Sequence, residues 1–414
     1  MSVPLLECSS LKSETRRVPL KGWRDLPVAG MLRSVEPFEI QIARGRRAVF
    51  ALEPECVALA ARTADGNVFL GPEWVFSWLS TLGRRYEPVV LVARRSGLLE
   101  GFWPFFECRL PVIGTALLPA CAHAADVFDP LAAPGAEHAL VEALERLAAS
   151  YAFAWLPLLS GEFTASTVDP LTRKNSSRHL VRPRTPRLEI DLSRFEDFDA
   201  WEQCTFGSKS RQSLRRKQRR LEDNHRVAFL EIADPAGAVQ WLDRIAELEK
   251  SSWKGAEGVG VFKRADHRAF YRILFEALAA SGRLRLSILL ADDQPAAYEI
   301  AFWNGHRHAM HTMAFDPAYA AYSPGRLLLL HSVRRCFTGQ AAVFDFLQND
   351  QAYKRQMANR ESQLHDWIVF PASLRGRLVR VAVRAVHAWT EWQARRRKAR
   401  EAATKAQETR PTTT

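Results

Sequence analysis

The sequence predicts an α/β protein built from two successive domains of similar plan. Three observations lead to this fold class. The chain of 414 residues is long for one compact core. Short apolar runs typical of strands alternate with stretches of helical periodicity. The order of helices, hairpin, helix and strand occurs once in each half, which indicates an internal duplication.

The first half starts after a mixed polar leader at residues 1–36, for which we expect little regular structure. Alternating or continuous apolar runs predict its strands, and Pro72 suits the first turn of a helix. The expected elements are strands at Phe38–Ile42, Val89–Arg94, Leu98–Glu107 and Phe153–Leu159, and helices at Ala51–Thr63, from Gly71, and at Glu137–Ala149. They define an N-terminal domain over residues 37–185.

The second half repeats this order as a domain over residues 186–371. Asp292-Asp293 and Asn304-Gly305 are turn signals that separate three strands. The expected elements are helices at Phe198–Thr205, Lys209–Asp223, Pro235–Ser252, His267–Ser281 and from Ser323, and strands at Val227–Ile232, Leu284–Ala291, Ala296–Trp303, His306–Ala314 and Ala341–Phe346.

The net charge of +12 is concentrated in two segments. Residues 208–226 carry +6 and residues 375–400 carry +8, so the rest of the chain is near −2. This distribution favours local contacts with anions over the coating of a nucleic acid. In the second segment, apolar residues at helical spacing predict a basic amphipathic helix within residues 372–414, followed by a polar tail.

Other features exclude several classes of protein. No run of about 18 uncharged apolar residues occurs, so we expect no transmembrane helix. The N-terminal residues lack the long apolar core of a secretory signal. The six cysteines form no C-x-x-C pair, which argues against a zinc site or a disulfide framework. We therefore expect a cytoplasmic protein without a metal.

The most informative stretch runs from Phe315 to Met357. A loop leads into a helix opened by Tyr322-Ser323-Pro324-Gly325, and a short strand ends at Phe346. The free N–H groups in the first turn of a helix bind phosphate well. This stretch indicates a nucleotide-type ligand at a sheet edge, although Pro-Gly also serves as a plain helix cap.

Several motifs, taken in order, carry a family resemblance over roughly residues 38–370. They are Gly71-Pro72-Glu73-Trp74, Ser208-Lys209-Ser210-Arg211 with Leu214-Arg215-Arg216, Trp253, Phe315-Asp316-Pro317-Ala318-Tyr319 with Ser323-Pro324-Gly325, and Phe344-Asp345-Phe346 with Asp350 and Tyr353-Lys354. With these motifs in this order, the chain resembles the Fem-like, BioF2/CelD-type branch of the GNAT acetyltransferases, which is found with bacterial exopolysaccharide and cellulose gene clusters. The resemblance implies two tandem GNAT-like (acyl-CoA N-acyltransferase) domains.

The resemblance also implies an acyl donor at the C-terminal domain and transfer to an amine. Acetyl-CoA is the implied co-substrate, held by Ser323, Gly325, Arg326 and Leu327. Of the usual GNAT pyrophosphate signature only Gly325 matches, and Leu327 stands where a small residue is expected. Fem proteins use aminoacyl-tRNA instead, so both donors stay open.

Four residues are candidates for the chemistry. Acyl transfer to an ammonium group needs a base, and Glu299 within an apolar strand is either that base or a solvent-facing carboxylate. Tyr353 could protonate the leaving thiolate, and Lys354 could hold a phosphate. Asp350 precedes them after the last expected strand, and these groups also suit a structural ion-pair network.

Three further residues are candidates for binding the substrate. Trp253 offers a platform for a sugar ring or belongs to the core. Asp345 ends the last expected strand. His311 and His308 are three apart on one strand and hence on opposite faces, so only one of them can face the cleft.

We therefore expect an acetyl-CoA-dependent N-acetyltransferase that acts on a nucleotide- or lipid-linked amino sugar in extracellular polysaccharide biosynthesis, similar to the holdfast-polysaccharide acetyltransferases. The alternatives are Fem-type aminoacyl transfer to a peptidoglycan precursor and a non-catalytic effector at a polysaccharide synthase. The C-terminal helix suggests binding of an anionic inner-membrane surface or of cyclic di-GMP through Arg380, Arg384, Arg396 and Arg400.

Overall fold

A computed structural model of the chain describes residues 37–63, 67–122, 124–386 and 396. All of these residues belong to the compact unit Pro37–Thr414. The expected leader at residues 1–36 and most of the expected C-terminal tail lie outside the described residues.

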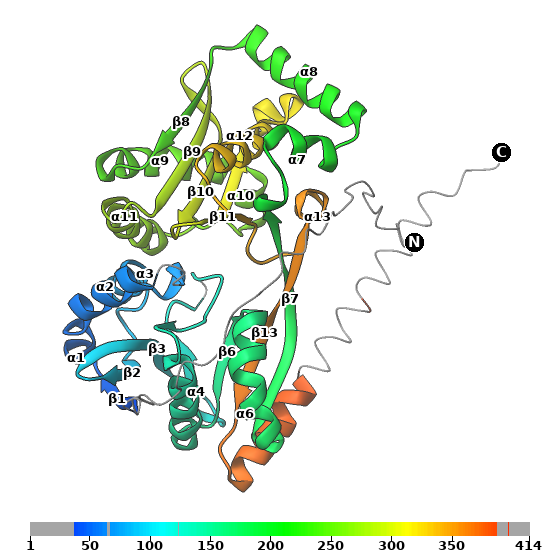
Figure 1. Ribbon diagram of the computed structural model, residues 1–414. Coiled ribbons are helices and arrows are strands. Elements are labelled where there is room, and N and C mark those ends of the chain that lie inside the picture. Colours follow the sequence, from blue (N-terminus) through cyan, green and yellow to red (C-terminus); the bar gives the residue numbers. More distant parts are fainter. Residues whose placement is uncertain (1–36, 64–66, 123, 387–395, 397–414) are drawn as a thin grey trace, which may run out of the picture. The chain divides into compact units, whose positions relative to one another are not determined.

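One mixed sheet runs through the described unit (Figure 1). Its strands follow the order β1-β2-β3-β4-β6-β13-β7-β12-β11-β10-β9-β8, with β5 paired to β3. The strands are β1 (Glu39–Arg44), β2 (Pro88–Arg95), β3 (Leu98–Leu110), β4 (Gly114–Pro119), β5 (Leu131–Ala132), β6 (Ala154–Leu159), β7 (His179–Asp191), β8 (Val227–Ile232), β9 (Leu284–Ala291), β10 (Gln294–Trp303), β11 (Arg307–Phe315), β12 (Val343–Asp345) and β13 (Arg360–Val369).

The strand order is nearly symmetric about the β7–β13 pair. On one side of the pair lies β6, preceded in the sheet by β1, β2, β3 and β4. On the other side lies β12, followed by β11, β10, β9 and β8. The two halves exchange their last strands, because β7 pairs with β12 of the second half while β13 pairs with β6 of the first. Figure 1 shows β7 and β13 side by side along their length. The expected domain boundary between residues 185 and 186 therefore falls inside β7.

Helices cover both faces of the second half of the sheet. Tyr298 donates a hydrogen bond to Glu249 of α9, whereas the next residue, Glu299, lies on the face covered by α12. The helices are α1 (Arg46–Phe50), α2 (Glu53–Arg62), α3 (Pro72–Ser80), α4 (Ala136–Leu147), α5 (Gly161–Phe163), α6 (Asp169–Lys174), α7 (Phe198–Thr205), α8 (Ser208–Asn224), α9 (Pro235–Ser251), α10 (Trp253–Glu257), α11 (Ala265–Ala280), α12 (Pro324–Thr338) and α13 (Ala352–Met357).

An aromatic cluster packs the two halves together. The Trp74 ring of α3 lies 5.1 Å from Phe302 and 5.7 Å from Phe270, centroid to centroid. Phe69 lies 5.9 Å from the same Phe302 ring. These side chains are buried in a cluster that includes residues of both halves, so burial of large rings stabilises the arrangement.

Most of the expected elements are confirmed, and the differences have physical causes. The helix expected at Ala51–Thr63 is α2, with Pro54 in its first turn, where a missing N–H costs nothing, and the short α1 before it was not expected. Strands β4, β7 and β13 were not expected. In the described part of the chain no helix combines the length and apolarity needed to cross a membrane.

Candidate active site

A cavity opens where two parallel strands of the second half separate. Strand β12 pairs with β11 only through Arg307–Ala309, and its register stops at Asp345. Strand β11 continues to Phe315 and forms one wall of a cavity of about 640 Å³. The start of α12, the start of α10 and residues 349–354 form the rest of the wall. A site of this size accommodates part of a nucleotide-type ligand.

The N-terminus of α12 forms one end of this cavity. Ser323 precedes the helix with a φ of 55°, and its hydroxyl accepts a 2.7 Å hydrogen bond from Lys217 Nζ of α8. A Cβ atom on Gly325 would lie 3.2 Å from Phe315 and 3.3 Å from Met313, both on the cavity wall. No acidic residue occupies the first turn, and Pro324 has no N–H while those of Arg326 and Leu327 donate to the Ser323 carbonyl oxygen. The free N–H of Gly325 and the Lys217 ammonium therefore suit a phosphate.

Arg326 adds a second cation beside this helix end. Its guanidinium donates a 2.7 Å hydrogen bond to Gln356 and lies 4.9 Å from the centre of the Phe206 ring. Burial lowers the pKa of Arg326, but a guanidinium stays protonated at any physiological pH. The expected donor residues Ser323, Gly325 and Arg326 therefore lie together on the cavity, whereas Leu327 is buried in the core behind it.

A bulge on β11 turns His311 toward the cavity. Ile300 faces Thr312 and Ala301 faces Met310, so His311 is the extra residue between them. A bulge of this kind re-aims a side chain and is frequent beside active sites. His311 was expected to bind substrate, and it lines the cavity.

His311 belongs to a chain of buried polar groups that joins both halves. Its Nδ1 lies 2.6 Å from a carboxylate oxygen of Asp126 in the first half, and its Nε2 lies 2.7 Å from the Tyr271 hydroxyl. Gln348 also donates a hydrogen bond to Asp126. A carboxylate on Nδ1 fixes the ring and stabilises an imidazolium, which is the arrangement of a general base.

Two buried lysines and a tyrosine lie on the same cavity. Lys354 donates hydrogen bonds of 2.8 and 2.7 Å to the carbonyl oxygens of Phe346 and Gln348, and burial lowers its pKa to about 8. Burial also lowers the pKa of Lys254, which donates to the Thr312 hydroxyl. Burial raises the pKa of Tyr353, so its hydroxyl keeps its proton at neutral pH.

Three other expected site residues lie away from the cavity. Glu299 is fully buried on the α12 face, where it accepts a hydrogen bond from His308 at 2.8 Å. Asp345 is fully buried between Arg187 and Arg307. Asp350 pairs with Arg355 on the surface. By contrast, Trp253 lines the cavity at the start of α10, with 43% of its surface exposed.

Asp126, Lys254 and Thr312 were not expected at the site. Asp126 follows an irregular loop in the first half, and only the exchanged architecture brings it to β11. Nothing in its local sequence marks it. Lys254 was easier to find from the sequence, because it is adjacent to Trp253, which was itself a candidate for binding the substrate.

The first half lacks an open counterpart of the α12 end. Helix α4 follows β4 and precedes β6, as α12 follows β11 and precedes β12. At its start the Glu137 carboxylate accepts a 2.8 Å hydrogen bond from the Gly135 N–H. This carboxylate puts a negative charge where a phosphate would bind. A separate cavity of about 730 Å³ lies here, lined by residues of both halves that include Asp129, Arg187 and Arg307.

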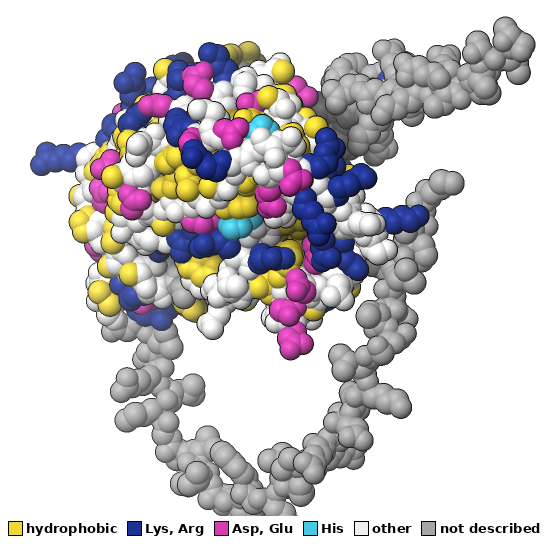
Figure 2. Space-filling view, turned by 90° about the horizontal axis from the view of Figure 1, so that it is seen from above, with side chains coloured by type: hydrophobic (Ala, Val, Ile, Leu, Met, Phe, Trp, Pro, Cys, Tyr) yellow, Lys and Arg dark blue, Asp and Glu magenta, His cyan; other side chains and the backbone are white. Residues whose placement is uncertain are grey.

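The two basic segments differ in their surroundings. Lys209, Arg216 and Arg219 of α8 are exposed, and the face in Figure 2 carries several dark-blue Lys and Arg side chains. Residues 374–386 are helical, and there Leu374 and Leu378 are 73% and 64% exposed. Arg384 and Arg396 are exposed, whereas Arg400 lies outside the described residues.

Comparison with known proteins agrees with this geometry. Residues 208–355 match the family model of the acetyltransferase (GNAT) domain. No curated protein matches the chain. Solved structures match most of it, among them the three described next, and because each of these is below 25% identical they show the fold alone.

The first is FemX, with 10% identity, a TM-score of 0.55, and coverage of 76% of this chain and 95% of that chain. The second is a conserved protein of unknown function from Bacteroides thetaiotaomicron, with 13% identity, a TM-score of 0.51, and coverage of 77% and 97%. The third is a DUF2156 domain of a lysylphosphatidylglycerol synthetase from Agrobacterium fabrum, with 13% identity, a TM-score of 0.51, and coverage of 76% and 92%. The expected tandem GNAT fold is confirmed over most of the chain, and the acetyltransferase (GNAT) domain at residues 208–355 indicates an N-acyltransferase.

Proposed function

We propose that this acyltransferase moves an acetyl group from acetyl-CoA to the amino group of a nucleotide- or lipid-linked sugar destined for extracellular polysaccharide. One observation carries the proposal. A single cavity is lined by the N-terminus of α12, by Tyr353 and by His311, whose Nδ1 is paired with Asp126 behind it. These are the three groups that a thioester aminolysis needs: a phosphate anchor, a proton acceptor and a proton donor.

The donor would lie along β11 with its pyrophosphate at the start of α12. The N–H group of Gly325, together with the Lys217 ammonium and the Arg326 guanidinium, would hold the pyrophosphate, since the Arg326 N–H already donates to the Ser323 carbonyl oxygen. The part of β11 beyond Ala309 has no register with β12 but stays paired with β10, so its alternate backbone N–H groups, those not directed at β10, face the space between β11 and β12. They would stabilise the oxyanion formed when the amine attacks the thioester carbonyl.

The proton transfers follow from the side chains on the cavity. His311 would take the proton of the attacking amine at Nε2 once the amine displaces the Tyr271 hydroxyl from that nitrogen, and Asp126 would stabilise the resulting imidazolium. Tyr353 would protonate the leaving sulfur. Lys254 and Lys354 are cations on the same wall, so they would stabilise negative charge that develops on the thioester or on the sulfur.

The acceptor would enter from the side of the second cavity. Phe69 and Ala309 line that cavity, and the Phe69 ring lies 5.9 Å from the His311 ring. Its lining contains both arginines and carboxylates, which suits a polar acceptor with hydroxyl, amino and anionic groups. Trp253 offers a stacking surface at the mouth of the donor cavity.

Ser323→Asp tests the donor anchor. The new carboxylate would take the position of the phosphate at the α12 N-terminus, as Glu137 does at α4, and like-charge repulsion of about 1.5–3 kcal/mol is expected. Calorimetry with coenzyme A should therefore give a Kd raised by about 10- to 100-fold. The melting temperature should stay equal or rise, because Asp is a good helix cap.

Ser323→Asn is the matched control for that experiment. It has the same shape without the charge, and Asn tolerates the left-handed conformation of this position. Its Kd for coenzyme A should stay within about threefold of the wild-type value. If Ser323→Asp bound coenzyme A as well as Ser323→Asn did, the donor would not lie at this helix end.

A second donor is favoured by one observation. Lys209, Arg216 and Arg219 of α8 are exposed on the helix that also supplies Lys217 to the cavity, and a polyanionic donor such as an aminoacyl-tRNA would use such a row of cations. If the protein bound tRNA tightly with steep salt dependence and bound coenzyme A weakly, the donor would be an aminoacyl-tRNA and the reaction a Fem-type transfer.

The C-terminal helix would attach the protein to a membrane surface or regulate its activity. We propose that its exposed leucines and its arginines contact an anionic inner-membrane surface or cyclic di-GMP, since both ligands combine an apolar or flat surface with phosphates. Arg380 is already engaged in part, because it donates a hydrogen bond to the carbonyl oxygen of Ser177.

A further inference from the structure

The helix that follows β13 turns an apolar stripe to the solvent. Residues 374–386 are helical, and the Gly376 N–H donates a 3.1 Å hydrogen bond to the Ser373 hydroxyl at the start of this helix. The stripe consists of four exposed apolar residues at spacings of four, three and four, which place them on one helix face: Leu374, Leu378, Val381 and Ala385.

The opposite face of this helix contacts the rest of the protein. Its positions are buried or half-buried, and Arg380 on this face donates a hydrogen bond to the carbonyl oxygen of Ser177. The residues of this face are Gly376, Val379, Arg380 and Val383. The helix therefore packs through one side, and the apolar stripe on the other side stays available to a partner.

A hairpin of the first half adds a second apolar element beside the helix. The turn between β3 and β4 carries Val112 and Ile113, which we call the hairpin tip. The Ile113 carbonyl oxygen accepts a 2.7 Å hydrogen bond from the Arg375 guanidinium. Gly114 leaves room for this contact, since a Cβ atom there would lie 2.5 Å from the guanidinium. The hairpin tip and the first turn of the helix are thus in contact, although they are far apart in the sequence.

Val112 occupies a backbone conformation that does not favour valine. Its φ is 67°, in the left-handed region, and its side chain is fully exposed. Glycine and asparagine are the usual residues in this region, whereas a β-branched side chain is strained there. Neither the backbone nor burial within the chain accounts for a valine at this position, which leaves contact with a partner as the reason for it.

Cations surround both elements. Residues 371–386 contain no Asp or Glu, and exposed arginines border the stripe at Arg375, Arg377 and Arg384. Two more exposed cations, Arg173 and Lys174, end the short helix α6 just before the Ser177 carbonyl that Arg380 contacts.

This combination fits an anionic lipid bilayer. Apolar side chains on one helix face enter the boundary between headgroups and acyl chains, while arginines beside them meet the lipid phosphates. The stripe spans a helix of 13 residues, or about 20 Å. A compact dinucleotide would pair with some of the arginines but would leave most of this stripe in water.

We propose that the helix at residues 374–386 and the hairpin tip form one surface that lies on an anionic lipid bilayer, with the apolar stripe and Val112 inserted among the headgroups. This surface rests on the membrane role proposed above for the C-terminal helix, with lipid as its partner and the hairpin as its second element. It is separate from the acyl-transfer machinery, since none of its residues lines the donor cavity.

The surface and the donor cavity lie at opposite ends of the β7–β13 pair. His179 faces Val369 at the end from which the helix follows, whereas Glu189 faces Arg360 at the end that adjoins β12. Binding of a bilayer should therefore leave the binding of coenzyme A unchanged.

Vesicle co-sedimentation of the full chain tests the proposal. Vesicles of phosphatidylcholine with about 30% phosphatidylglycerol are compared with vesicles of phosphatidylcholine alone. We expect binding to the anionic vesicles to be about tenfold tighter and to weaken as salt is added, because the arginines contact phosphates.

Val112→Asn and Leu378→Asn test the two elements separately. Asparagine tolerates the left-handed conformation of residue 112, and the Leu378 side chain is exposed, so both variants should stay folded. The Kd for anionic vesicles should rise about fivefold for Val112→Asn and about tenfold for Leu378→Asn, since each removes an apolar side chain from the inserted face. Val57→Asn is the matched control, because Val57 is an exposed valine on α2, outside both elements. Its Kd should stay within about twofold of the wild-type value.

The proposal is wrong if the wild type ignores anionic vesicles, binds neutral vesicles equally well, or is unaffected by either variant. Binding of cyclic di-GMP in calorimetry by a protein that ignores vesicles would assign the helix to a dinucleotide instead. Acyl transfer to a soluble amino sugar, measured without vesicles, should be unchanged in both variants. A wild-type protein that binds anionic vesicles as expected but transfers no acyl group would contradict the proposed function and support this surface.

Discussion

Replacing His311 with glutamine is expected to lower kcat of acyl transfer by about 100- to 1,000-fold, the range of a lost general base. Glutamine keeps a polar side chain of similar length near Tyr271 and Asp126 but cannot accept and hold a proton. The rate is measured as release of coenzyme A from acetyl-CoA, with the most active acceptor from a panel of amino sugars. The Kd for coenzyme A should stay within about threefold, because His311 does not lie at the phosphate end.

Asp126→Asn separates orientation from charge at the same site. Asparagine can still accept the hydrogen bond from Nδ1, but it provides no negative charge to stabilise the imidazolium, so kcat should fall by at least tenfold. Because Asp126 comes from the first half, this loss would show that the first half takes part in the chemistry.

His225→Gln is the matched control for His311→Gln. His225 forms a similar pair with Asp292 at 2.7 Å, but this pair lies on the surface outside the cavity. Its replacement should leave kcat within about twofold. If His311→Gln retained more than about a third of the wild-type kcat, another group would have to take the amine proton. Lys254 and Lys354, whose pKa values burial lowers, would then be the next candidates.

The sequence predicted the regular parts of the fold well. Helices α7 and α8 and strands β8, β9 and β12 lie within a few residues of the expected positions, because their apolar periodicity and turn residues agree. Strand β7 was missed, since Pro183 and Pro186 argue against a strand. Pairing with β13 over ten residues overrides that local signal. Strand β13 was missed because its first half, Arg360–Gln363, is polar.

The site was predictable where its residues adjoin the motif at the α12 start. Ser323, Gly325, Arg326, Tyr353 and Lys354 all lie on the cavity, as expected. Glu299 does not, since strand alternation alone could not tell which face lies under α12. The hydrogen-bond partner of His311 could not be predicted from the sequence, for a different reason. Asp126 is 185 residues away in the sequence, and only the packing of the two halves against each other brings it to His311.

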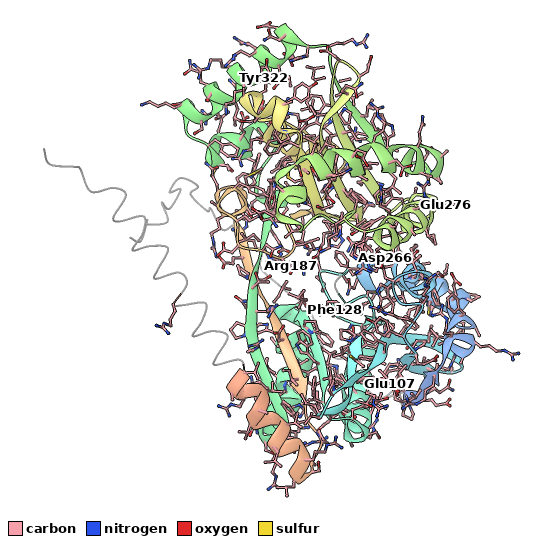
Figure 3. All side chains as sticks on the ribbon, turned by 180° about the vertical axis from the view of Figure 1, so that it is seen from behind. Glu107, Phe128, Arg187, Asp266, Glu276 and Tyr322 are labelled. Carbon is pink, nitrogen blue, oxygen red and sulfur yellow. The ribbon has the colours of Figure 1, made fainter. Side chains whose placement is uncertain are left out.

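Asp345→Asn is expected to lower the free energy of unfolding by about 3 kcal/mol. The carboxylate of Asp345 is fully buried and accepts hydrogen bonds from Arg187, Arg307 and the Leu347 N–H. Removing one member of a buried ion network leaves the other charges uncompensated, which costs about 3–5 kcal/mol when the partner is lost entirely. Arg187, labelled in Figure 3, lies on the exchanged strand β7. The network therefore couples the strand exchange to β12 beside the active site.

The pH dependence of this effect has a definite sign. Burial alone would raise the pKa of Asp345, but Arg187 and Arg307 outweigh burial and lower it. The unfolded carboxyl has a pKa of about 3.9. The stabilisation by Asp345 is therefore complete above about pH 4 and is lost as the pH falls through the lower pKa of the folded state. The difference in free energy of unfolding between the wild type and the variant, measured by urea unfolding, should accordingly be constant from pH 5 to 7 and should become smaller in acid.

Asp350→Asn provides the comparison for Asp345→Asn. Asp350 pairs with Arg355, and both side chains are about half exposed. A surface pair of this kind contributes little to the free energy of unfolding, because water screens it. Equal losses of unfolding free energy in the two variants would mean that burial does not determine how much the Asp345 network contributes to stability. A loss confined to Asp345→Asn, together with weaker coenzyme A binding, would mean that the exchanged strand β7 supports the geometry of the donor cavity through β12.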